Sequence, residues 1–113
     1  MSQHERIVTD EALEKALSWL RDNAQEMGDA KAETIRASHR LKVVKALEMK
    51  LHNDKPVSVQ EREALASSAY SEALERDAIA AGEYEKMRAL REAASLKIEA
   101  WRSEQANYRA LRI

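Results

Sequence analysis

Apolar residues recur every three or four positions along most of this chain, which is the spacing of one face of an α-helix. The first run begins after Thr9, whose hydroxyl is a candidate N-cap, and after the acidic residues Asp10 and Glu11. The run comprises Leu13, Ala16, Leu17, Leu20, Ala24 and Met27, and after Gly28 it resumes with Ala30, Thr34, Ala37, Leu41, Val44 and Leu51. A single glycine costs a helix only about 1 kcal/mol relative to alanine. The pattern therefore predicts one long first helix, with a kink at Gly28 left open.

A polar break follows over His52–Val57 and contains the only proline of the chain, Pro56. Ser58 and Glu61 have the spacing of a capping box, in which each side chain bonds an exposed backbone N–H of the other. The sequence therefore predicts a second helix that starts at Ser58. Its apolar positions are small at first and larger later: Ala66, Ala69, Ala73, Ala80, Tyr84, Met87, Ala94, Ile98, Trp101, Tyr108 and Leu111.

Two long helices joined by one turn predict an antiparallel hairpin. If the turn is centred near Lys55, residues whose numbers sum to about 110 lie opposite each other. This register places Gly28 beside Gly82, and a bend of the second helix at Gly82 is a further open alternative.

Charge supports the same pairing, because its sign alternates in blocks. Acids exceed cations by seven to three over residues 1–30 and by seven to two over 61–85, whereas cations exceed acids by seven to three over 31–55 and over 86–113. Folding at Lys55 brings basic blocks against acidic ones. We therefore predict an all-α fold, a long antiparallel helical hairpin that forms a single domain over residues 1–113, with residues 1–8 disordered.

Composition excludes several other classes. With two glycines and one proline in 113 residues, the chain has too few turn formers for a β-sandwich or a βαβ fold. The absence of cysteine excludes disulfides and thiolate zinc sites, and no apolar run reaches the roughly 18 residues that a membrane span needs. The first residues lack the basic and apolar regions of a signal peptide, so we expect a cytoplasmic protein without membrane partners.

A lone two-helix hairpin encloses little volume, so we expect its apolar flanks to associate with further copies. Residues off the main stripes are candidates for the surface between subunits, namely Leu47, Met49, Ile79, Leu90 and Leu96. Together with stripe residues they form the predicted oligomer and core packing set, which adds Tyr84, Met87, Ile98, Trp101 and Tyr108. The alternative is an unrecognised helix break that yields a compact bundle from one chain.

Catalytic signals are weak. The histidines His4, His39 and His52 share no metal-ligand spacing, and two isolated glycines cannot build a phosphate-binding loop. We therefore expect no enzyme activity, no metal and no cofactor.

The most basic segment runs from Arg36 to Lys50, and its cations can be read in two ways. A row of cations on a helix can follow a phosphate backbone, which makes Arg36, Arg40, Lys42, Lys45 and Lys50 candidate DNA-binding residues. The same side chains can instead pair with the acidic block of the second helix. Trp101 and Tyr108 are likewise either base-stacking platforms or packing residues, and their seven-residue spacing favours packing.

The order of these features resembles the UvsY-like recombination mediators of tailed phages, over roughly Leu17 to Arg112. The similarity rests on Ser18-Trp19-Leu20, Lys45-Ala46-Leu47-Glu48, Tyr84-Glu85-Lys86 and the segment from Trp101 to Leu111. The chain also resembles small prophage proteins that end in Glu-Ala-Trp-Arg-x-x-x-Ala-Asn, here Glu99 to Asn107. The family's Lys-Ala-Arg-Leu motif falls on residues 45–48, where Leu47 stands at the arginine position.

The resemblance implies a small helical protein that forms a homo-oligomer, binds single-stranded DNA and helps to load a recombinase, without a cofactor. Our leading interpretation from the sequence is thus a phage-type or prophage-type recombination accessory protein. The alternative is a structural or inhibitory helical module that binds another protein and has no affinity for nucleic acid.

Overall fold

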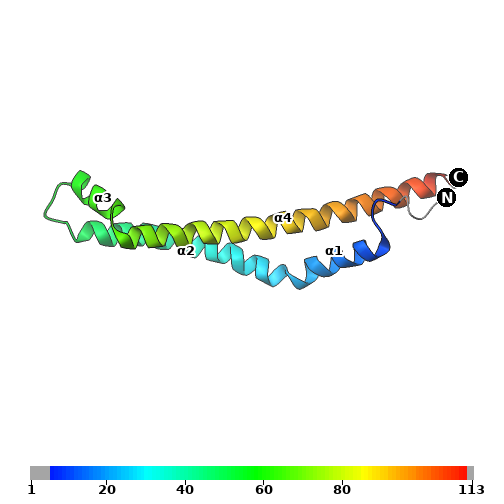
Figure 1. Cartoon of the computed structure of the whole chain (residues 1–113), viewed down its shortest axis with the longest axis horizontal. Coiled ribbons are helices and arrows are strands. Elements are labelled where there is room, and N and C mark those ends of the chain that lie inside the picture. Colours follow the sequence, from blue (N-terminus) through cyan, green and yellow to red (C-terminus); the bar gives the residue numbers. More distant parts are fainter. Residues whose placement is uncertain (1–5, 112–113) are drawn as a thin grey trace. The chain divides into compact units, whose positions relative to one another are not determined.

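The computed structural model describes residues 6–111, and within this range the chain forms four α-helices and no strand (Figure 1). The helices are α1 (Asp10–Asp22), α2 (Ala24–Lys50), α3 (Val57–Leu65) and α4 (Ser68–Leu111). The all-α prediction is confirmed.

Contacts group the chain into two units. The first comprises Met1–Met27 with Lys86–Ile113, and the second comprises Gly28–Glu85. Helices α2 and α4 contribute to both units.

Each unit contains an antiparallel helix pair. In the first unit Asp10 contacts Trp101, near the beginning of α1, and Trp19 and Met27 line a groove together with Arg91. In the second unit Lys31 lies over Tyr84, whereas His39 lines a groove with Asp77, farther back along α4. Residue numbers in these contacts sum to between 110 and 118, close to the predicted hairpin register.

The first helical segment begins where the sequence predicted. The Thr9 side chain accepts a hydrogen bond from the backbone N–H of Ala12 at 3.0 Å, which makes it the N-cap of α1. The interruption, however, is at Asn23 and not at Gly28. The Asn23 backbone departs from helical angles (φ −107°, ψ 5°), and both its N–H and its side-chain Nδ2 donate to the carbonyl of Trp19 at 3.0 Å. Gly28 lies inside α2.

The predicted capping box at Ser58 is wrong. Helix α3 begins one residue earlier, at Val57, its N-cap is Pro56, and no side chain caps it. The Pro56 carbonyl accepts from the backbone N–H groups of Val59 and Gln60, both at 3.0 Å, which closes the first turn. Because the proline ring holds φ at −57°, the chain enters the helix directly after it and leaves Ser58 inside the first turn.

A second break, which the sequence analysis missed, separates α3 from α4 at Ala66 and Ser67. The Ser67 hydroxyl donates to the carbonyl of Ala64 at 2.7 Å and accepts from the N–H of Tyr70 at 3.1 Å. One side chain therefore satisfies the end of α3 and caps the start of α4. The other candidate bend, Gly82, lies within α4.

The core of the described chain is built from alanines. The buried apolar residues are Val8, Ala16, Ala37, Ala64, Ala73, Ala80 and Ala94, and no large side chain in the described range is fully buried. Along α4 several half-buried and buried residues follow one another at steps of three, four or seven positions: Ala73, Ala80, Tyr84, Met87, Ala94, Ile98, Trp101 and Tyr108. This is the heptad spacing of coiled coils, and small residues on it let helix backbones approach closely.

The predicted disordered terminus, residues 1–8, falls mostly outside the described residues. Residues 6–8 are described, and they bond to α4 through the backbone of Ile7 and Val8. None of the helices within residues 6–111 has the length and apolar character that crossing a membrane would require.

Candidate interaction surfaces

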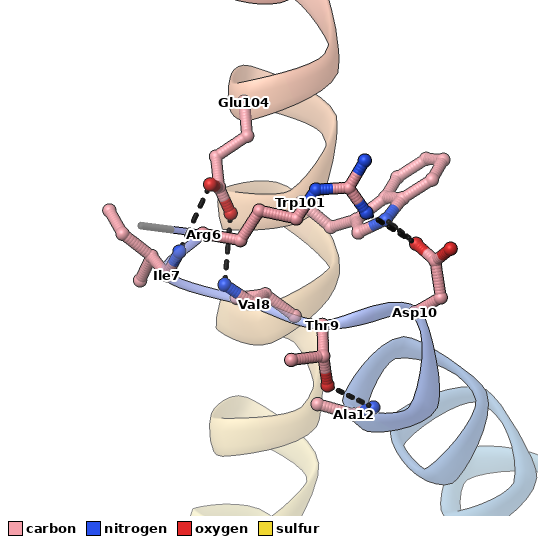
Figure 2. Close-up of polar contacts among 8 residues, drawn as sticks. All are labelled: Arg6, Ile7, Val8, Thr9, Asp10, Ala12, Trp101 and Glu104. Carbon is pink, nitrogen blue, oxygen red and sulfur yellow. Dashed lines mark hydrogen bonds and ion pairs between the residues drawn. The ribbon is translucent and has the colours of Figure 1, made fainter. Parts of the chain in front are cut away.

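The N-terminal clasp is the most specific polar constellation in the described chain, and we define it as Arg6, Ile7, Val8, Asp10 and Glu104. The Glu104 carboxylate, on α4, accepts the backbone N–H of Ile7 at 3.0 Å and that of Val8 at 2.9 Å, one on each oxygen (Figure 2). Val8 is only 6% exposed, although it precedes α1. A single carboxylate therefore fixes the segment before α1 against α4.

A second carboxylate of the clasp joins three elements. Asp10 Oδ1 accepts from the guanidinium of Arg6 at 3.2 Å and from the indole Nε1 of Trp101 at 3.0 Å (Figure 2). The Arg6 guanidinium also lies 5.8 Å from the ring centre of Tyr108, while its Nε is buried without a partner. Trp101 and Tyr108 are both half-buried, and each contacts a residue of the clasp, Asp10 and Arg6 respectively.

The sequence marked Asp10 only as an acid at the start of the first helix, and it did not mark Glu104 at all. Ile7 and Glu104 are 97 residues apart, and neither belongs to a recognisable motif. The available signal was the hairpin register, since their numbers sum to 111, close to the predicted 110. Glu104 also stands three residues after Trp101 and four before Tyr108, on the same face of α4.

The five candidate DNA-binding residues all lie on α2, but they differ in their surroundings. Arg36 is exposed and pairs with Glu33 of the same helix at 3.1 Å. Lys45 is half-buried and pairs with Glu61 of α3 at 2.9 Å. Arg40, Lys42 and Lys50 are exposed and form no ion pair with another residue of the described range.

The two interpretations of the basic segment thus apply to different residues. Of these five residues, Lys45 alone pairs with a carboxylate beyond its own helix within residues 6–111. The remaining cations face solvent and are available to a polyanion or to an acidic protein surface.

The predicted packing residues fall into an exposed group and a half-buried group. Leu47, Ile79 and Leu90 are 57%, 57% and 42% exposed. The others are half-buried, namely Met49, Tyr84, Met87, Ile98, Trp101 and Tyr108. Leu96, a further candidate for the surface between subunits, is 62% exposed.

Further large aliphatic side chains are exposed in both units. They include Leu17, Ile35, Val43, Leu51, Val57, Leu65 and Leu74. An alanine core combined with exposed leucine, isoleucine and valine leaves apolar surface that association with a partner would bury.

Metal-ligand geometry is absent from the described range, in which no three His, Asp or Glu side chains gather to hold an ion. His39 is exposed on α2 and His52 lies in the turn after it, whereas His4 falls outside the described residues.

Searches against protein-family models, curated proteins and solved structures found no match to this chain.

Proposed function

We propose that this protein is a non-enzymatic, self-associating helical interaction module. The observation that carries the proposal is the distribution of apolar side chains, with alanine in the core and larger aliphatic residues at the surface. Burying each exposed leucine or isoleucine is worth roughly 1.5–3 kcal/mol, so association of several of them can offset the entropy lost on binding.

The proposal is tested by the mass of the protein in solution. Sedimentation or light scattering between about 1 and 200 µM should give a mass of at least two chains at the upper end. A mass of one chain, 12.9 kDa, across this range would overturn the proposal.

Single-stranded DNA binding is the second candidate function, and the exposed cations Arg40, Lys42 and Lys50 on α2 favour it. It is the function that the resemblance to UvsY-like mediators implies, with a recombinase as protein partner and the cytoplasm as setting. In an oligomer each subunit contributes the same few cations, so avidity can compensate for a net charge of −1.

This candidate is tested by binding of a fluorescent oligo-dT of about 30 nucleotides at roughly 50 mM salt, where phosphate contacts are strongest. Replacing Arg40, Lys42 and Lys50 with Ala should weaken binding and flatten its salt dependence. The matched control replaces the exposed Lys15, Lys86 and Lys97 with Ala, which removes the same charge away from the basic segment. Absence of binding by the wild type, or equal losses in both variants, would refute the candidate.

A further inference from the structure

We propose that a groove at the junction of α1 and α2, closed on one side by α4, is a binding site for a small apolar carboxylate. We define this Asn23 groove by its six lining residues, all from the first unit: Trp19, Leu20, Asn23, Ala24, Met27 and Arg91. The inference goes beyond the proposed self-association and does not depend on it.

The groove lies where the first helical segment is interrupted. Helix α1 ends at Asp22 and α2 begins at Ala24, with the non-helical backbone of Asn23 between them. The half-buried Leu20 and Met27 line the groove on either side of this break. Its volume is about 350 Å³, which falls within the range of roughly 300–1,000 Å³ that is usual for ligand sites.

Arg91 is an exception on the inward side of α4. It stands four residues after the half-buried Met87 and three before the buried Ala94, so it occupies a position of the packing seam, yet it is exposed. The numbers of Asn23 and Arg91 sum to 114, which agrees with the antiparallel register of this unit. The seam is therefore open at this level, with one polar residue on each side.

The charge of the groove comes from Arg91 alone, because none of the other lining residues is acidic or basic. Arg91 makes no ion pair or hydrogen bond with another residue of the range 6–111, whereas Arg102 on the same helix pairs with Glu99 at 3.0 Å. A guanidinium binds a carboxylate through two parallel N–H···O bonds. One cation balances the single charge of a carboxylate better than the nearly double charge of a phosphate group.

The remaining lining residues suit the apolar part of such a ligand. Trp19, Leu20, Ala24 and Met27 supply ring, aliphatic and thioether surface. The indole N–H of Trp19 donates to no residue within 6–111, whereas that of Trp101 donates to Asp10 at 3.0 Å. Trp19 therefore offers a ring to pack against and an N–H that a ligand oxygen can accept.

Hydrocinnamate, a phenyl ring on a short chain with one carboxylate, is the probe. The indole N–H signals of the two tryptophans are followed by NMR and assigned with Trp101→Phe. Titration to about 20 mM should move the Trp19 signal with saturation, because a ligand of this size binds with a Kd on the order of millimolar. The Trp101 signal should stay in place, since this residue does not line the groove.

The role of the charge is tested on the ligand and on the protein. Hydrocinnamyl alcohol keeps the ring and loses the charge, so it should bind the wild type about tenfold more weakly or worse. Arg91→Gln should weaken hydrocinnamate binding by a similar factor. The matched control Lys86→Gln removes the same charge from an exposed residue of α4 outside the groove and should leave the affinity unchanged. The comparison of acid with alcohol needs no variant and holds whether or not Arg91→Gln folds.

The carboxylate can belong to a free acid or to the C-terminus of a peptide, and a second pair of probes separates these sources. Acetyl-Ala-Ala-Phe with a free carboxyl terminus should bind at least as tightly as hydrocinnamate if the site takes peptide ends, and its amide should not bind. Binding of hydrocinnamate without binding of the tripeptide would assign the site to free acids.

Three results would each overturn the site. These are an unmoved Trp19 signal with both acids, equal affinity for the acid and the alcohol, and equal losses in Arg91→Gln and Lys86→Gln. None of them bears on the mass of the protein in solution, so a failure of this inference is distinguishable from a failure of the proposed self-association.

Discussion

Single side chains decide where the helices of this protein begin and end. Thr9 caps α1, the Asn23 side chain bonds back to Trp19 where α1 stops, and Ser67 serves the end of α3 and the start of α4. The Thr9 and Ser67 hydroxyls accept backbone N–H groups that the helix starts leave without a partner. The Asn23 amide and the Ser67 hydroxyl add a second hydrogen bond to the carbonyls of Trp19 and Ala64.

Two serines near the turn should therefore differ in their effect on stability. Replacing Ser67 with Ala removes both of its hydrogen bonds and should lower the free energy of unfolding by about 1 kcal/mol. Ser58→Ala should be close to neutral, because Ser58 is exposed within α3 and makes no capping bond. Chemical denaturation of both variants measures the difference, and a larger cost at Ser58 would mean that the capping box operates after all.

Glu104 should be the residue that holds Ile7 and Val8 of the N-terminal clasp on α4. Glu104→Gln leaves a single acceptor oxygen for two backbone donors, so exchange of the Ile7 and Val8 amides with solvent should accelerate about tenfold or more. Hydrogen exchange followed by NMR reports these two amides directly. Glu99→Gln is the matched control on the same helix, because Glu99 pairs with the exposed Arg102, and it should leave both rates unchanged. Unaltered exchange in Glu104→Gln would show that the clasp does not depend on this carboxylate.

At the scale of elements, helix type, pairing and the turn before Pro56 were predictable, whereas the breaks at Asn23 and at Ala66 and Ser67 were not. The apolar spacing and alternating charge blocks predicted an antiparallel helical fold, because both are properties of long segments. Ser58 matched a capping box better than Ser67 did, yet Pro56 starts the helix first and leaves the box unused. The clasp depends on which distant residues meet, and no local pattern around Ile7 or Glu104 encodes this.

The buried alanines of α4, Ala73, Ala80 and Ala94, form a seam in which a larger side chain should be destabilising. Ala80 is 6% exposed, whereas its neighbour Ala81 faces solvent. Ala80→Leu forces extra volume between closely packed helices and should lower the free energy of unfolding by roughly 1–3 kcal/mol. Ala81→Leu adds the same atoms outside the seam and should change it by less than about 0.5 kcal/mol. Similar costs for the two variants would argue against close packing along the seam.

For the whole molecule, the exposed aliphatic side chains couple the stability of the fold to association with other copies. When folding is coupled to association, the unfolded chains are favoured by dilution, so the midpoint of thermal unfolding depends on protein concentration. A protein whose exposed apolar residues are covered only by other copies should show this dependence, and a stable monomer should not.

The melting temperature should therefore rise with concentration. For a dimer of chains of this length, the entropy of unfolding predicts an increase of roughly 3 °C for each tenfold increase in protein concentration. Calorimetry or circular dichroism between about 2 and 200 µM covers two such steps. If the wild type melts at a constant temperature over this range, its exposed leucines and isoleucines are not covered by association, and the self-association proposal fails with them.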